Sequence, residues 1–127
     1  MFNVEMRRRF DARQGLSSPV WRESGRAPVT VVSVIMRVGF TFSDTQLDEN
    51  ERFVDTDTLE HLLDTYAARL SGNQWTDLFD PHPTFEFVTR WLYQELVQHI
   101  PQLNHVSLDN ETLGVCTTYH ADQASAG

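Results

Sequence analysis

The stretch Thr30–Phe42, TVVSVIMRVGFTF, decides the fold because its side chains alternate in character. One set is almost wholly apolar, whereas the intervening set includes serine, arginine and glycine. Alternation with a period of two is typical of a β-strand with one buried face. Such a strand needs neighbouring strands and a layer that covers its apolar side. The apolar set consists of Thr30, Val32, Val34, Met36, Val38, Phe40 and Phe42.

Strand patterns also occur near both ends of the chain. Residues 2–10 alternate between a mostly apolar set and a polar set, which predicts a first strand. The segments around Val106–Leu108 and Val115–Tyr119 predict two shorter strands. Glycine, serine and proline make residues 11–28 loop-like, and residues 43–52 form an acidic turn region.

Two helices are expected between the second and third strands. The first covers residues 57–70, and we expect Gly72 to end it in the left-handed conformation. The second begins after Pro83 with Thr84 as its N-cap and stops before Pro101. Helical spacing in the first helix predicts one buried stripe, formed by Leu59, Leu62, Leu63, Tyr66 and Leu70.

The predicted order of elements is β-β-α-α-β-β, without the regular βαβ alternation of a doubly wound fold. We therefore predict an α+β fold, with a four-stranded antiparallel sheet and two helices on one face. Residues 1–120 are expected to form a single domain, and residues 121–127 a flexible C-terminal tail. Val31 and Ile35 add apolar groups to the second face of the long hairpin, which suggests assembly with other subunits.

Composition restricts the classes of function. The chain has 127 residues and a net charge of −8, which argues against nonspecific nucleic-acid binding. No apolar run approaches the roughly 20 residues that span a bilayer, so we expect no membrane partner. A charge at Glu5 precedes any apolar stretch, so we expect no signal peptide and a cytoplasmic location. The lone Cys116 excludes an internal disulfide and is expected to be a small core residue.

Charge is distributed unevenly along the chain. Residues 1–40 hold seven arginines against three acids, whereas residues 41–127 hold three arginines against fifteen acids. Two explanations remain open for the basic first third. Its arginines either lie on solvated faces and pair with acids elsewhere, or they line a site for a small anion.

Several segments carry a family resemblance. His82–Leu92 (HPTFEFVTRWL) resembles an Asn-Pro-Thr-x-Glu-x-hydrophobic-x-Arg helix start, and Phe53–Leu59 (FVDTDTL) a hydrophobic-Val-Asp-Phe-x-x-Leu helix entry. Leu103–Leu108 followed by Glu111-Thr112 resembles a strand that leads to a ligand-anchoring glutamate, and Tyr119 falls where a late strand tyrosine is usual. In this order and spacing, the segments resemble the 6-pyruvoyl tetrahydropterin synthase and 6-carboxy tetrahydropterin synthase family, whose members have the tunnel fold.

The resemblance implies a role for Glu111. In that family one carboxylate grips the aminopyrimidinone ring of the ligand in a pocket between subunits, and Glu111 matches its position, with Thr112 beside it. A carboxylate accepts two parallel hydrogen bonds from an amino group and a ring N–H. The alternative is that Glu111 is a solvated acid in a turn. The resemblance also implies a homo-hexamer built as a dimer of trimers.

The chain departs from the family at the metal site. The family binds zinc through histidines in a Phe-x-Ala-x-His stretch and a His-Gly-His stretch. Here Gln14 takes the first position, and Ser24 and Arg26 take the other two. Glutamine and serine are weak zinc ligands and a charged arginine repels a cation, so we expect no zinc and no other cofactor. Arg26, with Arg13 and Arg22, is instead a candidate partner for an anionic tail on the ligand.

The proton-transfer groups of the family are also missing. Residues 11–28 contain no cysteine, and Leu70-Ser71-Gly72 stands where the family has Leu-Asp-His. No catalytic residue is therefore assigned, and whether the chain is an enzyme stays open. The candidate ligand-binding residues are Glu111, Thr112, Arg26, Gln14 and Ser24.

Three functions remain in view. The first is a diverged homologue that binds a pterin-like or purine-like ligand through Glu111, without zinc and without the parent lyase activity. The second is an active 6-pyruvoyl or 6-carboxy tetrahydropterin synthase that acts on dihydroneopterin triphosphate. The third is a structural or interaction subunit whose pocket is a relict.

Overall fold

The computed structural model describes residues 1–15, 31–52, 56–79 and 83–120. Its elements are β1 (Phe2–Ala12), β2 (Val32–Phe42), a 3-10 helix (Asp44–Gln46), α2 (Thr56–Gly72), α3 (Trp75–Leu78), α4 (Phe85–Leu96), β3 (Leu103–Asn110) and β4 (Val115–His120). The strands form one sheet in the order β1-β2-β3-β4, and each neighbouring pair is antiparallel. The predicted α+β fold with β-β-α-α-β-β order is confirmed, and the predicted tail at 121–127 lies outside the described residues.

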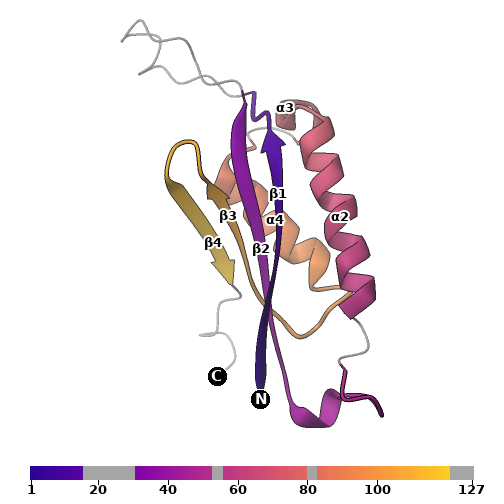
Figure 1. Cartoon of the computed structure of the whole chain (residues 1–127). Helices are drawn as coiled ribbons and strands as arrows, with labels where there is room; N and C mark the ends of the chain where they lie inside the picture. The colour runs from indigo at the N-terminus through magenta and orange to yellow at the C-terminus, as the bar shows by residue number, and fades with distance from the viewer. Residues whose placement is uncertain (16–30, 53–55, 80–82, 121–127) are drawn as a thin grey trace, which may run out of the picture.

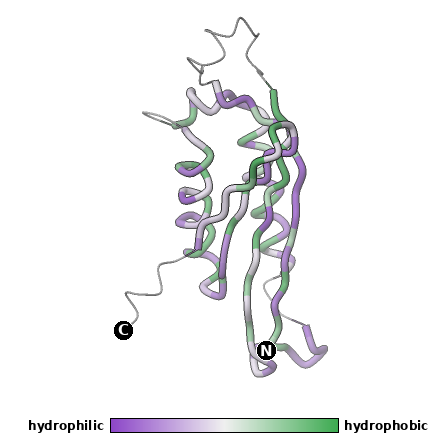
Figure 2. The backbone as a smooth tube through the Cα atoms, turned by 90° about the vertical axis from the view of Figure 1, so that its left-hand side faces the viewer, coloured by the Kyte–Doolittle hydropathy of each residue, from purple (hydrophilic) through white to green (hydrophobic). Residues whose placement is uncertain are grey.

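The two long helices cover one face of the sheet (Figure 1). α2 packs along β1, and α4 packs along β3 and β4. In β2 the residues that point to the helices, such as Val34, Met36 and Val38, are fully buried, and those between them are partly exposed. Figure 2 colours the backbone by hydropathy and shows hydrophobic and hydrophilic residues along both the strands and the helices. The period-two pattern therefore identified the inner face of the long hairpin correctly.

The stripe predicted for the first helix is confirmed in α2. Leu59, Leu63 and Leu70 are fully buried, while Leu62 and Tyr66 are partly buried against the core. These side chains fill the space between the helix and the β1 side of the sheet. Within the described ranges, no helix is long and apolar enough to cross a membrane.

The start of α4 also follows the prediction. The Thr84 hydroxyl accepts a hydrogen bond of 3.1 Å from the backbone N–H of Phe87, as an N-cap does. Val88, Leu92 and Leu96 then form the buried side of the helix. This helix fixes the inner layer behind β3 and β4.

α2 ends at Gly72, as predicted, but the left-handed conformation expected for Gly72 is wrong. The described glycines with positive φ are Gly15 and Gly114. Side chains satisfy the last carbonyls of the helix instead: Asn73 donates to the Arg69 carbonyl and Trp75 donates to the Leu70 carbonyl, both at 3.0 Å. A left-handed glycine is therefore not needed to end this helix.

The prediction that Cys116 is a core residue is also wrong, because Cys116 is exposed. β4 lies at the edge of the sheet and only one of its faces meets α4. Tyr119 lies on that inner face, where its ring packs edge-on against Tyr93 with centroids 5.1 Å apart. Cys116 differs from Tyr119 by an odd number of positions, so the pleat turns it to the opposite face.

Candidate functional site

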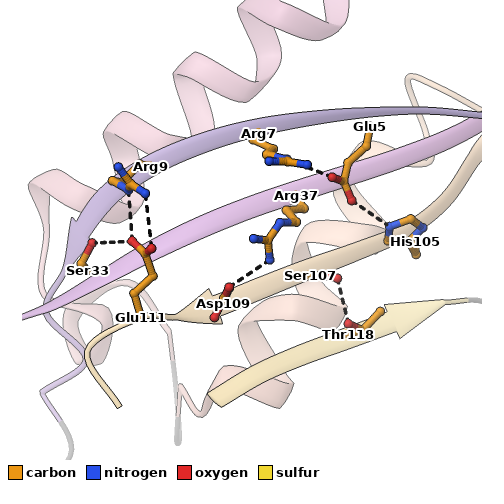
Figure 3. Close-up of polar contacts among 10 residues, drawn as sticks. All are labelled: Glu5, Arg7, Arg9, Ser33, Arg37, His105, Ser107, Asp109, Glu111 and Thr118. Atoms are coloured by element: carbon orange, nitrogen blue, oxygen red, sulfur yellow. Dashed lines mark hydrogen bonds and ion pairs between the residues drawn. The ribbon is translucent and has the colours of Figure 1, made fainter. Parts of the chain in front are cut away.

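The sheet face that points away from α2 and α4, here called the open face, carries mostly polar side chains (Figure 3). They come from alternate positions of the strands and from the residue that follows β3. Ile35 is an apolar member of this face and is partly buried. The assembly with other subunits that Val31 and Ile35 suggested stays a prediction. The main members of the open face are Asn3, Glu5, Arg7, Arg9, Asp11, Ser33, Ile35, Arg37, Gly39, Thr41, His105, Ser107, Asp109, Glu111 and Thr118.

A tight turn after β3 holds Glu111 at the edge of this face. The buried side chain of Asn110 accepts a hydrogen bond of 3.1 Å from the N–H of Leu113, and its carbonyl accepts one of 2.8 Å from Gly114. Gly114 has a φ of 72°, a conformation that glycine adopts without steric cost. The turn therefore fixes the backbone on both sides of Glu111.

Ser33 anchors Glu111 and Thr112 to the beginning of β2. The N–H of Glu111 donates to the Ser33 carbonyl and the N–H of Ser33 donates to the Thr112 hydroxyl, both at 2.9 Å. The Ser33 hydroxyl also donates to Glu111 Oε1 at 3.1 Å. Glu111 thus has a fixed backbone and one oriented carboxylate oxygen.

Arg9 reaches this carboxylate from β1 (Figure 3). Its Nε lies 3.0 Å from Glu111 Oε1, and its Nη2 lies 3.3 Å from Oε2. These two parallel bonds form the fork that arginine makes with carboxylates. The side chains remain 66% and 37% exposed, so the pair is reachable from solvent.

Two more arginine–carboxylate ion pairs lie on the open face. Arg37 contacts Asp109 at 3.0 Å, and Arg7 contacts Glu5 at 3.0 Å. The hydrogen bond to Asp109 raises the pKa of Arg37, against a smaller lowering by burial. Arg7, Arg9 and Arg37 therefore pair with acids. For these three arginines, this favours pairing with acids elsewhere in the chain over a site for a small anion.

The structure describes three of the five predicted site residues, Glu111, Thr112 and Gln14. Glu111 and Thr112 meet at Ser33, as described. Gln14 is engaged elsewhere: its Nε2 donates to the Pro83 carbonyl at 3.0 Å, just before α4. Ser24 and Arg26 lie outside the described residues, and so does Arg22. The predicted convergence of Gln14, Ser24 and Arg26 with Glu111 stays a prediction.

Gln14, the described one of the three positions that match the zinc ligands of the pterin synthase family, does not fit that metal. Gln14 presents its amide N–H to a carbonyl, which is a structural contact and not a metal-ligand arrangement. Among residues 1–15, 31–52, 56–79 and 83–120, no group of three histidine, cysteine, aspartate or glutamate side chains could hold a metal ion.

Sequence reasoning missed Arg9 and Ser33. Their positions in the polar set of each strand correctly placed both on one face. What the sequence lacked was the register, which sets Asp11 opposite Ser33 and Val34 opposite Asn110, and so brings Ser33 next to Glu111. No protein-family model and no curated protein matches the chain, so the resemblance to pterin synthases stays a prediction.

Proposed function

We propose that this protein binds a pterin-like or purine-like ring through Glu111, without zinc. The ring would present an amino group and a neighbouring ring N–H to the two carboxylate oxygens. The open face of the sheet would carry the ligand. The Ser33 hydroxyl would orient the carboxylate, and the bond from the Ser33 N–H to the Thr112 hydroxyl would fix the backbone beside it.

The observation that supports the proposal is the fork between Arg9 and Glu111. A guanidinium edge offers two parallel N–H donors in one plane, and the same pair of donors occurs on an aminopyrimidinone ring. The Glu111 carboxylate already accepts such a pair at 3.0 and 3.3 Å. An aminopyrimidinone ring would therefore make the same two parallel hydrogen bonds to Glu111 that Arg9 makes.

Exchange of Arg9 for a ligand is energetically feasible. An exposed ion pair contributes about 0–1 kcal/mol, because water competes for both charges. Hydrogen bonds to a charged group contribute roughly 1.5–3 kcal/mol when the partners are well matched. The Arg9 side chain is 66% exposed and can move into solvent, while the Ser33 hydroxyl continues to orient Oε1.

The proposal also places the ligand between subunits of a homo-oligomer, with a hexamer as the expected assembly. The Glu111 side chain lies on the open face and is 37% exposed, which leaves room for a second chain to enclose the ring. Light scattering during size-exclusion chromatography checks this part. A mass several times that of the 14.6 kDa chain is expected, and a monomer would contradict the assembly.

Paired ligands that differ in one donor test the proposed recognition. Calorimetric titration with pterin and with lumazine, which has an oxo group where pterin has the amino group, is the direct comparison. We expect saturable binding of pterin and at least roughly tenfold weaker binding of lumazine, because one carboxylate oxygen would face an acceptor.

A second pair covers purines. Guanine carries the amino group and hypoxanthine lacks it, so guanine is expected to bind more tightly if the site prefers purines. A ligand at a hundred times its dissociation constant should raise the free energy of unfolding by about 2.7 kcal/mol. Equal affinity for both members of both pairs, or binding of none of the four, would refute the proposal and favour a structural subunit.

A further inference from the structure

A pocket lies at the end of the hairpin where β1 begins and β2 ends. Phe2 pairs with Phe42 there, and the hairpin extends past the first turn of α2 (Figure 1). The volume of the pocket is about 560 Å³, within the roughly 300–1,000 Å³ that is typical of ligand sites. Phe2 is seven residues before Arg9 along β1, so roughly 23 Å of extended strand separates this pocket from the partner of Glu111. The lining residues are Phe2, Phe42, Leu47, Asp48, Glu51, Arg52, Thr56 and Asp57.

Two phenylalanine rings form the apolar wall of the pocket. The rings of Phe2 and Phe42 stack with their centroids 5.4 Å apart and an angle of 29° between their planes. Phe42 is buried and stacks in turn on Phe40, with centroids 6.0 Å apart, whereas Phe2 is 42% exposed. Leu47 is partly buried and extends this wall. The core therefore holds Phe42 in place, and Phe2 offers an uncovered aromatic surface to a ligand.

A tight turn forms the polar side of the pocket. Asp48 Oδ1 accepts hydrogen bonds from the backbone N–H groups of Asn50 and Arg52, at 2.8 and 2.9 Å. The backbone N–H of Asp48 also donates to the Arg52 carbonyl at 2.8 Å. Glu51 lies inside this turn with a φ of 59°, and it is the one residue other than glycine with a positive φ in the described ranges. The turn therefore holds the backbone of Glu51 in one conformation beside the pocket.

Acidic side chains outnumber basic ones around the pocket. Asp48, Glu51 and Asp57 line it together with Arg52, so three negative charges stand against one positive charge. The backbone N–H of Arg52 lowers the pKa of Asp48, and so does the positive charge of the Arg52 side chain. The carboxylates of Glu51 and Asp57 form no hydrogen bond or ion pair with any residue that the structure describes. Two uncompensated negative charges therefore lie beside an aromatic wall.

We propose that this pocket binds an aromatic amine, a small molecule in which a short alkyl link joins an aryl ring to a primary ammonium group. The ring packs against Phe2 and Phe42, because offset and edge-on contacts between aromatic rings are favourable. The carboxylates of Glu51 and Asp57 attract the ammonium group, whose three N–H donors match their unpaired acceptors. A cation also gains energy over the faces of nearby aromatic rings. This inference does not rest on the function proposed for Glu111.

Probes of similar shape and different charge test the proposal. ¹H–¹⁵N spectra of the full chain are recorded during titration with 2-phenylethylammonium, with the neutral 2-phenylethanol and with N-acetyl-lysine methylamide, which carries its ammonium on an alkyl chain. We expect the aromatic amine to shift the amide signals of Phe42, Glu51 and Arg52 in a saturable way. The alcohol should bind roughly tenfold more weakly, because it carries no charge for the two carboxylates. No saturable shift with the amine, or equal affinity for the alcohol, would overturn the proposal. Equal or tighter binding of the lysine derivative would overturn the assignment to aromatic amines.

Variants tie the binding to the pocket. Glu51→Gln keeps the size of the side chain and removes its charge, and we expect roughly three- to tenfold weaker binding of 2-phenylethylammonium. Glu49→Gln is the matched control, because Glu49 lies in the same turn region and does not line the pocket. Phe2→Leu keeps an apolar side chain and removes the ring, so the amine should bind roughly two- to fivefold more weakly. Wild-type affinity in a folded Glu51→Gln or Phe2→Leu protein, or an equal loss in Glu49→Gln, would refute the site.

Discussion

Arg9 on β1 reaches over β2 to hold both carboxylate oxygens of Glu111, at 3.0 Å from Nε to Oε1 and 3.3 Å from Nη2 to Oε2. The two residues are 102 positions apart in the sequence. The contact ties the first strand to the turn after the third. Under the proposed function, a ligand at Glu111 would have to displace the two N–H donors of Arg9.

Replacement of Arg9 by alanine is expected to strengthen ligand binding at Glu111. The ligand no longer has to displace a guanidinium whose exposed pair contributes about 0–1 kcal/mol, so the affinity for pterin should rise by up to about fivefold. Calorimetric titration of wild type and Arg9→Ala measures the change. Arg7→Ala is the matched control, since Arg7 pairs with Glu5 and not with Glu111. Weaker binding in Arg9→Ala would mean that Arg9 holds the ligand and does not compete with it.

Loss of the N-cap of α4 should lower stability by about 1 kcal/mol. Thr84→Ala removes the hydroxyl that accepts from Phe87, and an N-cap substitution of this kind costs about 0.5–2 kcal/mol. Urea denaturation of Thr84→Ala against wild type provides the measurement. Thr84→Ser keeps the acceptor and should stay close to wild type. If both variants lose the same amount, the methyl group and not the hydrogen bond would explain the loss.

The contact between Gly39 and His105 predicts a non-additive pair of substitutions. Gly39→Ala alone should destabilise the fold by about 1–3 kcal/mol, because the new Cβ overlaps the imidazole and forces it aside. In a His105→Ala background the same change should be neutral, or stabilising by about 0.5–1 kcal/mol, since alanine costs less backbone entropy than glycine. Urea denaturation of the four proteins gives the coupling energy. Additive effects would contradict the close approach.

Asp48 should titrate below the ordinary range of an aspartate. The backbone N–H of Arg52, with that of Asn50, donates to its carboxylate and lowers its pKa. A lowered pKa in the folded state means that the carboxylate form stabilises the turn above the pKa of the unfolded chain, about 3.9. This contribution is lost as the pH falls through the folded value. Carboxyl ¹³C shifts of Asp48 followed by NMR should give a midpoint below the value of about 3.9 for an unperturbed aspartate; a midpoint at or above that value would contradict these bonds.

Much of the fold could be predicted from local pattern. The alternation in β1 and β2, the leucine stripe of α2 and the Thr84 cap each depend on residues close in sequence. The four-residue helix α3 is too short to show a period. The left-handed conformation predicted for Gly72 is absent because the side chains of Asn73 and Trp75 bond the last carbonyls of the helix. Cys116 was predicted to be buried because cysteines usually are. Its position an odd number of residues from Tyr119 places it on the exposed face of β4 instead.

The candidate site was less accessible from sequence. Glu111 was singled out only through the family resemblance, because an acid in a turn has no signal of its own. Its contacts with Arg9 and Ser33 depend on the register of β1, β2 and β3. The hydrophobic pattern shows which face a side chain lies on, but not which residues lie opposite each other. The close approach of His105 to Gly39 depends on the same register between β2 and β3.

Calorimetric titration of Glu111→Gln with pterin, alongside wild type and Asp109→Asn, tests the central claim most directly. Asp109 is the matched control because it is an ion-paired acid on the same face, held by Arg37. We expect wild type and Asp109→Asn to bind alike, and Glu111→Gln to bind roughly ten- to hundredfold more weakly, because a carboxylate that accepts two hydrogen bonds is lost. Equal binding of pterin by Glu111→Gln and wild type would contradict the account.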